Sequence, residues 1–117
     1  MNKHKKKGVI TIYTLELESG KYYVGQSKTP KKRINQHFSG NGSAWTKKFK
    51  PIKIIKEIEL NTNNWRAALE VEKQLTLKLM VIFGWQNIRG AGWSQLELKS
   101  KPRELIHEGI QQINAQD

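Results

Sequence analysis

The chain contains no cysteine, so disulfide bonds and metal sites built on thiolates are excluded. It also lacks any apolar run near the roughly 20 residues that a membrane-spanning helix requires. The basic start, residues 1–7, is followed by a short apolar stretch that soon reaches Glu16 and Glu18, which is atypical of a signal peptide. We therefore expect a soluble, cytoplasmic protein.

Acidic residues are scarce. There are 10 Asp and Glu against 21 Lys and Arg, which gives a formal net charge of +11. Between Ser19 and Lys56 the chain has ten basic residues and no acidic one. This uneven charge is typical of a protein that binds a phosphate backbone, although a solvated basic face would look similar. An anionic membrane is a poorer partner, because no helix pairs a basic face with an aromatic insertion face.

Length and composition indicate a single small domain. A chain of 117 residues without internal repeats favours one core. We expect a basic flexible arm at residues 1–8, a folded domain at 9–95 and a C-terminal helical extension at 96–117. The three histidines lack the spacing of a metal site, and no glycine-rich loop of the Walker type is present.

Hydrophobic periodicity and turn residues predict the elements. Strands are predicted at 9–17, 22–27 and 52–59, helices at 30–38 and 65–83, a helical turn at 44–49, a loop at 87–93 and a terminal helix at 101–112. The first two strands form a hairpin around Ser19-Gly20, and Pro30 suits the first turn of the following helix.

Polar side chains gather where the hairpin meets this helix. Tyr13 and Tyr23 lie on neighbouring strands and can share one face. Arg33 and His37 are spaced i, i+4 and therefore share a helix face. Taken alone, the tyrosines are more typical of half-buried strand residues than of a site, and Arg33 and His37 are more typical of solvent-facing surface residues.

Glu72 lies on the apolar side of the long predicted helix. That side comprises Trp65, Ala68, Leu69, Leu75, Thr76, Leu79 and Phe83. A carboxylate there is costly unless it is paired, reaches solvent or a cleft, or binds a metal. Phosphodiester cleavage needs groups that accept a proton, bind phosphate and hold a metal ion. A Tyr or His can accept the proton, Arg33 can bind phosphate bidentately, and Glu72 can hold Mg²⁺.

The order and spacing of these motifs resemble the GIY-YIG nuclease domain. The first signature is Thr11-Ile12-Tyr13, with Thr in place of Gly, and the second is Tyr23-Val24-Gly25. The family's helix arginine, following histidine, metal-binding glutamate and late asparagine fall on Arg33, His37, Glu72 and Asn87. The resemblance covers residues 10–93, and the segment 40–47 is similar to a small single-domain subgroup.

The resemblance implies an α/β fold of the α+β type, with a small three-stranded antiparallel sheet flanked by helices. It implies an endonuclease that hydrolyses one DNA strand per active site with Mg²⁺, for which Mn²⁺ is a possible substitute. Tyr13 would be the general base supported by Tyr23, and His37 would touch phosphate or relay a proton. Glu72 would bind the metal. The alternatives are a nucleic-acid-binding module with weak or no turnover and a structural RNA-associated protein.

Nucleic-acid contacts are expected outside this catalytic group. The residues expected to make them are Lys31, Lys32, Lys47, Lys48, Trp45 and Asn87. Trp45 and Trp93, in loop-like settings, are candidates for stacking on bases, whereas helical phase predicts Trp65 in the core. We expect a DNA partner and a monomer or weak dimer, because no dimerisation stripe is evident.

Overall fold

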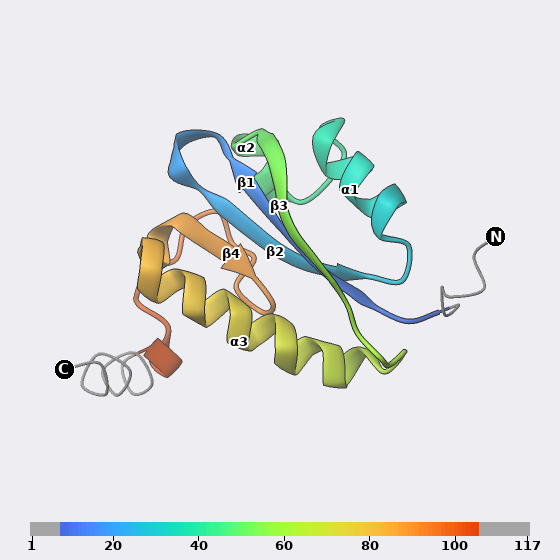
Figure 1. Cartoon of the computed structure of the whole chain (residues 1–117). Helices are drawn as coiled ribbons and strands as arrows, with labels where there is room; N and C mark the ends of the chain where they lie inside the picture. Colours follow the sequence, from blue (N-terminus) through green and yellow to red (C-terminus); the bar gives the residue numbers. More distant parts are fainter. Residues whose placement is uncertain (1–7, 106–117) are drawn as a thin grey trace.

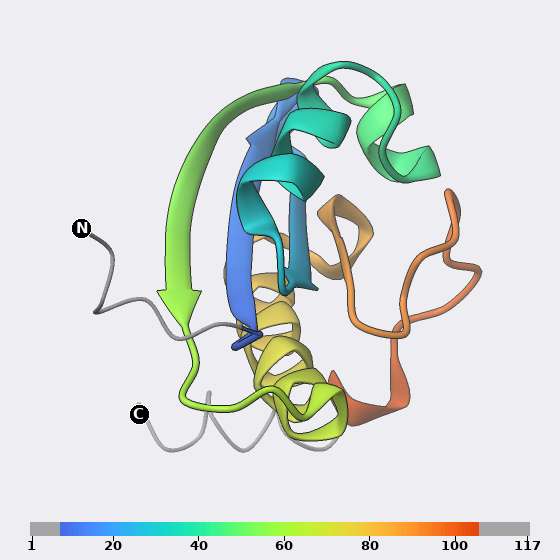
Figure 2. The same ribbon diagram turned by 90° about the vertical axis from the view of Figure 1, so that its right-hand side faces the viewer.

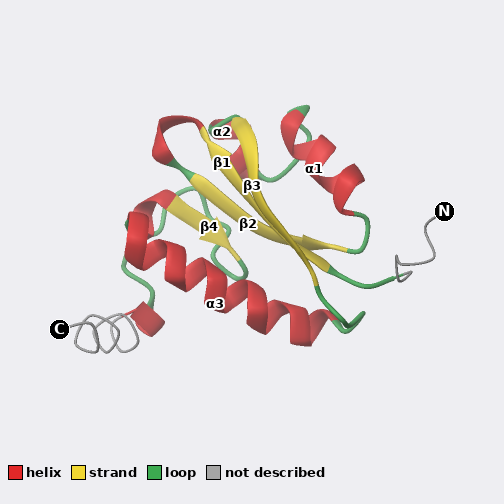
Figure 3. Cartoon of the chain, in the orientation of Figure 1, coloured by secondary structure: helices red, strands yellow, loops and turns green. Residues whose placement is uncertain are grey.

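The computed structural model describes residues 8–105. In chain order the elements are β1 (Thr11–Leu17), the short helix η1 (Glu18–Gly20), β2 (Tyr22–Ser27), α1 (Pro30–Phe38), α2 (Ala44–Lys48), β3 (Pro51–Glu59), α3 (Trp65–Phe83), the short helix η2 (Trp85–Asn87) and β4 (Ile88–Gly90). Figure 3 shows how these helices and strands alternate. The predicted bounds of β2, α1 and α3 are confirmed, whereas the terminal helix and the basic arm lie mostly outside the described residues.

The four strands form one sheet in the order β3-β1-β2-β4. β1 is antiparallel to both β2 and β3, and β4 runs parallel to β2. The predicted three-stranded antiparallel sheet was therefore one strand short, because β4 falls in the segment expected to be a loop. The end of β4 has no room for a side chain, because a Cβ at Gly90 would lie 2.7 Å from Thr76 Oγ1.

Helices cover both faces of this sheet. In Figure 1, α1 and α2 lie above the sheet and α3 lies below it, and Figure 2 gives the same arrangement from the side. Ile34 of α1 and Trp45 of α2 form one apolar cluster with Tyr13, Leu15 and Leu17. Ala68 of α3 forms the other cluster with Ile10, Ile12 and Val24. Because successive side chains of a strand point to opposite faces, the side chains of β1 contribute to a small core on each face of the sheet.

The long helix α3 begins at Asn64, whose side chain accepts hydrogen bonds from the backbone N–H groups of Arg66 and Ala67. It ends before Gly84, which has a φ of 95°. Within the described residues, no helix is long and apolar enough to cross a membrane.

The buried side of α3 differs from the predicted one at both ends. Its buried residues are Ala68, Glu72, Thr76, Leu77 and Met80. Trp65 and Phe83 are instead 58% and 41% exposed. The prediction that Trp65 belongs to the core was wrong, because the buried side repeats every four residues from Ala68 and Trp65, in the first turn, lies off that line. Glu72 keeps its predicted place in the middle.

Candidate active site

Two phenols meet on the face of the sheet covered by α1. Tyr13 lies opposite Gly25 in the β1–β2 pairing. A Cβ at Gly25 would lie 2.5 Å from Tyr13 Cζ and Oη, so the absent side chain lets the Tyr13 ring lie across β2. The ring centroids of Tyr13 and Tyr23 are 6.4 Å apart. Tyr13 is 1% exposed, whereas Tyr23 is only partly buried and stands nearer to solvent.

His37 joins the tyrosines from the last turn of α1. Its imidazole is fully buried, and its Nε2 lies 2.9 Å from Tyr13 Oη. Its ring centroid is 4.9 Å from that of Tyr23. The other ring nitrogen, Nδ1, lies 2.9 Å from Oγ1 of Thr46 in α2. His37 therefore links β1 to α2 through the interior and does not face solvent.

Arg33 lies one helical turn before His37. Its Nη1 donates a hydrogen bond of 2.9 Å to Gln36 Oε1, which fixes one side of the guanidinium. Its positive charge acts on both phenols. Because Arg33 is only partly buried, its remaining donors can reach an anion that approaches the tyrosines.

Glu72 approaches the same place from α3, although α3 covers the opposite face of the sheet. β4 pairs with β2 only as far as Gly90 opposite Val24. The chain then turns at Ala91, whose φ is 50°, and the Ala91 backbone N–H donates a hydrogen bond to Glu72 Oε2. The carboxylate thus lies beside the end of the short strand β4. Its charge contributes to the raised pKa of both Tyr13 and Tyr23. The side chain of Gln26, the residue after Gly25 in β2, also lies against Glu72.

Burial dominates the protonation of the tyrosines. It raises the pKa of Tyr13 well above the ordinary value, and the charge of Tyr23 adds to this, while Arg33 opposes it. Burial raises the pKa of Tyr23 as well, and the negative charge of Glu72 adds to this effect, whereas the positive charge of Arg33 lowers that pKa. Both side chains are therefore neutral phenols at pH 7.

Burial also determines the charge states of the other two titrating groups. It lowers the pKa of His37 to about 4, helped by the positive charge of Arg33, so the imidazole is neutral at pH 7. Burial raises the pKa of Glu72, against the Ala91 hydrogen bond and the neighbouring Gln26 side chain. A buried carboxylate with a raised pKa gains most from a nearby cation.

The residues present fit one divalent cation. Over residues 8–105, no three His, Cys, Asp or Glu side chains gather in one place. Mg²⁺ commonly keeps several waters and is held by one or two carboxylates together with substrate phosphates. Glu72 supplies one such carboxylate, so substrate and water would complete the coordination.

The residues predicted to contact nucleic acid differ in exposure. Lys31 and Lys32 at the start of α1, and Lys47 and Lys48 at the end of α2, are all exposed. Asn87 is partly buried. Its Oδ1 accepts a hydrogen bond of 2.7 Å from Lys21 Nζ, and its Nδ2 donates one to the backbone carbonyl of Phe83. It ties the start of β2 to the end of α3.

The expectation that Trp45 stacks on bases was wrong. Trp45 is 2% exposed, and its Nε1 donates a hydrogen bond of 3.0 Å to the backbone carbonyl of Tyr22. Arg89 covers its ring, with the guanidinium carbon 4.1 Å from the ring centroid. The segment is glycine-rich and looked like an open loop, but α2 presses it against the sheet.

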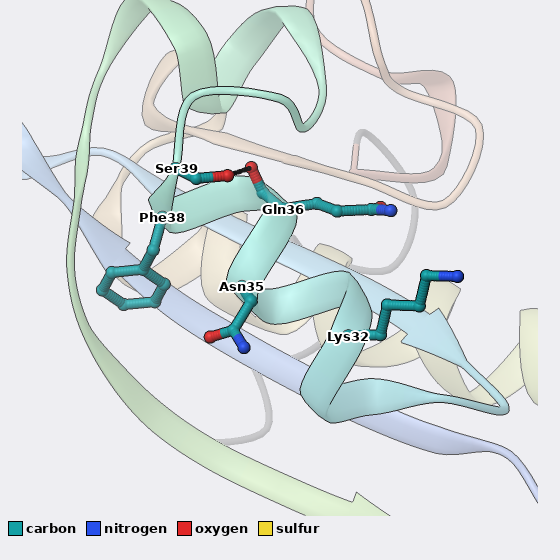
Figure 4. A pocket seen from close by; sticks show the side chains of 5 residues that line it. All are labelled: Lys32, Asn35, Gln36, Phe38 and Ser39. Carbon is teal, nitrogen blue, oxygen red and sulfur yellow. Dashed lines mark hydrogen bonds between the residues drawn. The ribbon is translucent and has the colours of Figure 1, made fainter.

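The outer side of α1 carries an open depression of about 680 Å³. Its lining residues are Lys32, Asn35, Gln36, Phe38 and Ser39. Figure 4 shows Lys32 and Gln36 extending to one side of the helix and Phe38 and Asn35 to the other. Arg33 and His37 do not line this depression, although Arg33 donates a hydrogen bond to Gln36, which does.

Sequence reasoning missed three polar partners. Thr46 bonds His37, the Ala91 N–H bonds Glu72, and the Gln26 side chain also lies against Glu72. A backbone N–H carries no sequence signal. Thr46 lies in the segment 40–47 that resembles a small subgroup, and that segment was the available pointer to it.

Comparison with known proteins gives a family match and several relatives. The model of the GIY-YIG catalytic domain matches residues 9–79. A UPF0213 protein of Bacillus cereus is 34% identical over 70 residues, which cover 57% of this chain and 71% of that protein. A UPF0213 protein of Cupriavidus necator is 28% identical over 61 residues, covering 52% and 66%. No solved structure gives a significant match.

Proposed function

The chain belongs to the GIY-YIG family, whose catalytic domain implies nuclease-type activity, and from this premise we propose that it is a metal-dependent DNA endonuclease. It would hydrolyse one strand per active site. The observation that carries the proposal is that Arg33 and Glu72, a carboxylate on the helix at the other face of the sheet, both act on the pKa of the two phenols.

Each group suits one requirement of phosphodiester hydrolysis. Arg33 would bind the non-bridging oxygens, oriented by its bond to Gln36. Tyr13 would take the proton of the attacking water, directly or through the more exposed Tyr23. His37 would serve as the partner of Tyr13 rather than touch phosphate, because it is fully buried.

Glu72 would hold the divalent cation. Mg²⁺, or Mn²⁺ in its place, supplies charge neutralisation at the phosphoryl and leaving oxygens when bound. The Ala91 N–H keeps one carboxylate oxygen fixed, which orients the other. A cation there would also reverse the effect of burial on the pKa of Glu72.

The surrounding surface suits a nucleic acid. Lys31, Lys32, Lys47 and Lys48 would contact the backbone on either side of the cut. The depression on the outer side of α1 is lined in part by Lys32 and could follow the same strand. DNA inside the cell is the proposed substrate, so we propose a cytoplasmic location.

Burial of Tyr13 favours a second candidate, a nucleic-acid-binding module with weak or no turnover. A phenol that is 1% exposed and carries a raised pKa is a poor base unless its own proton can leave. The two candidates predict the same binding and differ only in cutting.

The test is a digestion panel of duplex, nicked, branched and single-stranded DNA, with RNA, in Mg²⁺ and Mn²⁺. We expect wild-type protein to nick at least one DNA, and Glu72→Ala to stop cutting while salt-sensitive binding persists. Binding without cutting by the wild type under every metal would favour the second candidate. Equal cutting by Glu72→Ala would remove Glu72 from the site.

A further inference from the structure

A buried chain of hydrogen bonds runs from the sheet into α2. Tyr13 Oη lies 2.9 Å from His37 Nε2, and His37 Nδ1 lies 2.9 Å from Thr46 Oγ1. The exposed fractions of Tyr13, His37 and Thr46 are 1%, 0% and 1%. Gly42 closes this chain from the loop side, since a Cβ there would lie 2.1 Å from His37 Nδ1. Water therefore does not offer either ring nitrogen an alternative partner.

The far end of the chain fixes the direction of its hydrogen bonds. The hydroxyl of Thr46 donates to the backbone carbonyl of Ser43, with Oγ1 and O 3.2 Å apart. Thr46 Oγ1 also lies 3.2 Å from Ser43 Oγ, a hydroxyl that can itself donate to Thr46. Because a carbonyl can only accept, we assign the single proton of the Thr46 hydroxyl to the Ser43 carbonyl. Thr46 Oγ1 then faces His37 as an acceptor, and His37 Nδ1 must carry the proton.

The near end agrees with this direction. With Nδ1 protonated, Nε2 of the neutral imidazole has a lone pair and accepts the Tyr13 proton. In the opposite tautomer, Nε2–H would point at Tyr13 Oη, and the phenol proton would need another acceptor. Arg33, which also hydrogen-bonds the Tyr13 hydroxyl, carries donors only and cannot accept that proton.

We propose that Thr46 is a positioning residue that holds His37 in the Nδ1–H tautomer, so that Nε2 is the proton acceptor for Tyr13. This deepens the proposed function and rests on it for its catalytic consequence. Thr46 touches neither substrate nor reacting atoms, and it acts through His37.

The catalytic consequence is a base that need not become a phenolate. As the attacking water gives a proton to Tyr13 Oη, Tyr13 gives its own proton to His37 Nε2. The water oxygen bonds to phosphorus, the bond from phosphorus to the leaving oxygen breaks, and that oxygen takes a proton from solvent water to leave as a hydroxyl. His37 becomes an imidazolium whose Nδ1–H still bonds Thr46, and the relay reverses to release the proton after product leaves.

The direct test is the ¹⁵N spectrum of the His37 imidazole in the wild-type protein, in Thr46→Val and in Thr46→Ser. We expect a protonated Nδ1 and an unprotonated Nε2 in the wild type. Thr46→Val keeps the shape and removes the acceptor, so the Nε2–H tautomer should gain population. Thr46→Ser keeps the hydroxyl and should restore the wild-type pattern, and it serves as the matched control for folding.

Plasmid nicking provides the second readout. Losing a partner that orients a catalytic histidine should slow Thr46→Val about 10- to 100-fold, by analogy with such partners at metal sites. Thr46→Ser should retain most of the wild-type rate, and DNA affinity should not change in either variant. A general loss of structure would instead lower affinity and narrow the spread of the amide chemical shifts.

Two results would overturn the proposal: an Nε2–H tautomer in the wild type, or an unchanged tautomer in folded Thr46→Val. An absence of nicking by the wild type would count against the proposed function instead. In that case the nitrogen shifts would still decide the role of Thr46.

Discussion

The candidate site has two sides that satisfy their polar groups in different ways. On the α1 side, Tyr13, His37 and Thr46 are neutral and bond one another in a closed chain. On the α3 side, Glu72 is a buried carboxylate with a backbone N–H as its donor. Among residues 8–105, neither salt bridge involves Glu72. The first side is complete as it stands, whereas the second gains from an added cation.

This difference suggests a division of labour. Neutral, fully bonded groups cost little to bury and hold a geometry. An uncompensated carboxylate costs free energy in the apo protein and can recover it when a cation binds. The predictions below probe each side and the groups that join them.

Arg33 joins the two sides, and its removal should have the largest effect. Arg33→Ala should slow DNA nicking about 10²- to 10³-fold, since it removes a donor aimed at the charge that develops on phosphate. Arg66→Ala is the matched control, because Arg66 is exposed at the start of α3. Single-turnover plasmid nicking measures both rates. An Arg33→Ala rate equal to that of Arg66→Ala would take Arg33 out of the site.

Gly25 sharpens the geometry of the neutral side. Gly25→Ala places a methyl group 2.5 Å from Tyr13 Oη, so the ring must move or the hairpin must distort. Overpacking of this kind typically costs about 1–3 kcal/mol of unfolding free energy. Chemical denaturation measures it, with Gly92→Ala as the control, because nothing lies within 4 Å of a Cβ at Gly92. Equal stability of the two variants would contradict the close contact.

His37 gives the neutral side a pH dependence. Its folded pKa of about 4 lies below the ordinary 6.5, so the unfolded chain binds more protons between these values. Stability should therefore be intact above pH 6.5 and fall by about 3 kcal/mol in all as the pH drops to 4 and below. His37→Gln should lack this component. Parallel curves of unfolding free energy against pH for the two proteins would refute the assignment.

Glu72 should show the opposite sign. Burial raises its folded pKa above the ordinary 4.5, so the fold favours the protonated carboxyl and loses stability as the pH rises through that folded value. Glu72→Gln should therefore raise the melting temperature at pH 7 without metal, and the gain should vanish below pH 4.5. Calorimetry at the two pH values measures this. A variant less stable than the wild type at pH 7 would indicate a hidden cationic partner.

The groups that carry chemistry could be predicted from the sequence because each has a distinctive place in a periodic element. Tyr13 and Tyr23 alternate on a hairpin, Arg33 and His37 share a helix face, and Glu72 interrupts an apolar helix side. Such placements depend on local geometry, which spacing encodes.

The remaining features depend on contacts between distant segments. β4 is only three residues long and is followed by small residues. It forms by parallel pairing with β2, so no alternating pattern in the sequence marks it. Trp45 looked exposed because its neighbours are polar and glycine-rich, whereas Arg89 and the Tyr22 carbonyl bury it. Thr46 acquires its role only from the loop that folds over His37.

The most direct test of the account is the rate at which wild-type protein and Glu72→Gln convert supercoiled plasmid to nicked circles as Mg²⁺ is titrated. Because Glu72→Gln is expected to be at least as stable as the wild type, a lost rate reports chemistry and not unfolding. The account predicts Mg²⁺-dependent nicking by the wild type and almost none by Glu72→Gln at any Mg²⁺ concentration. Equal rates for the two proteins, or nicking by the wild type that persists in a chelator, would contradict it.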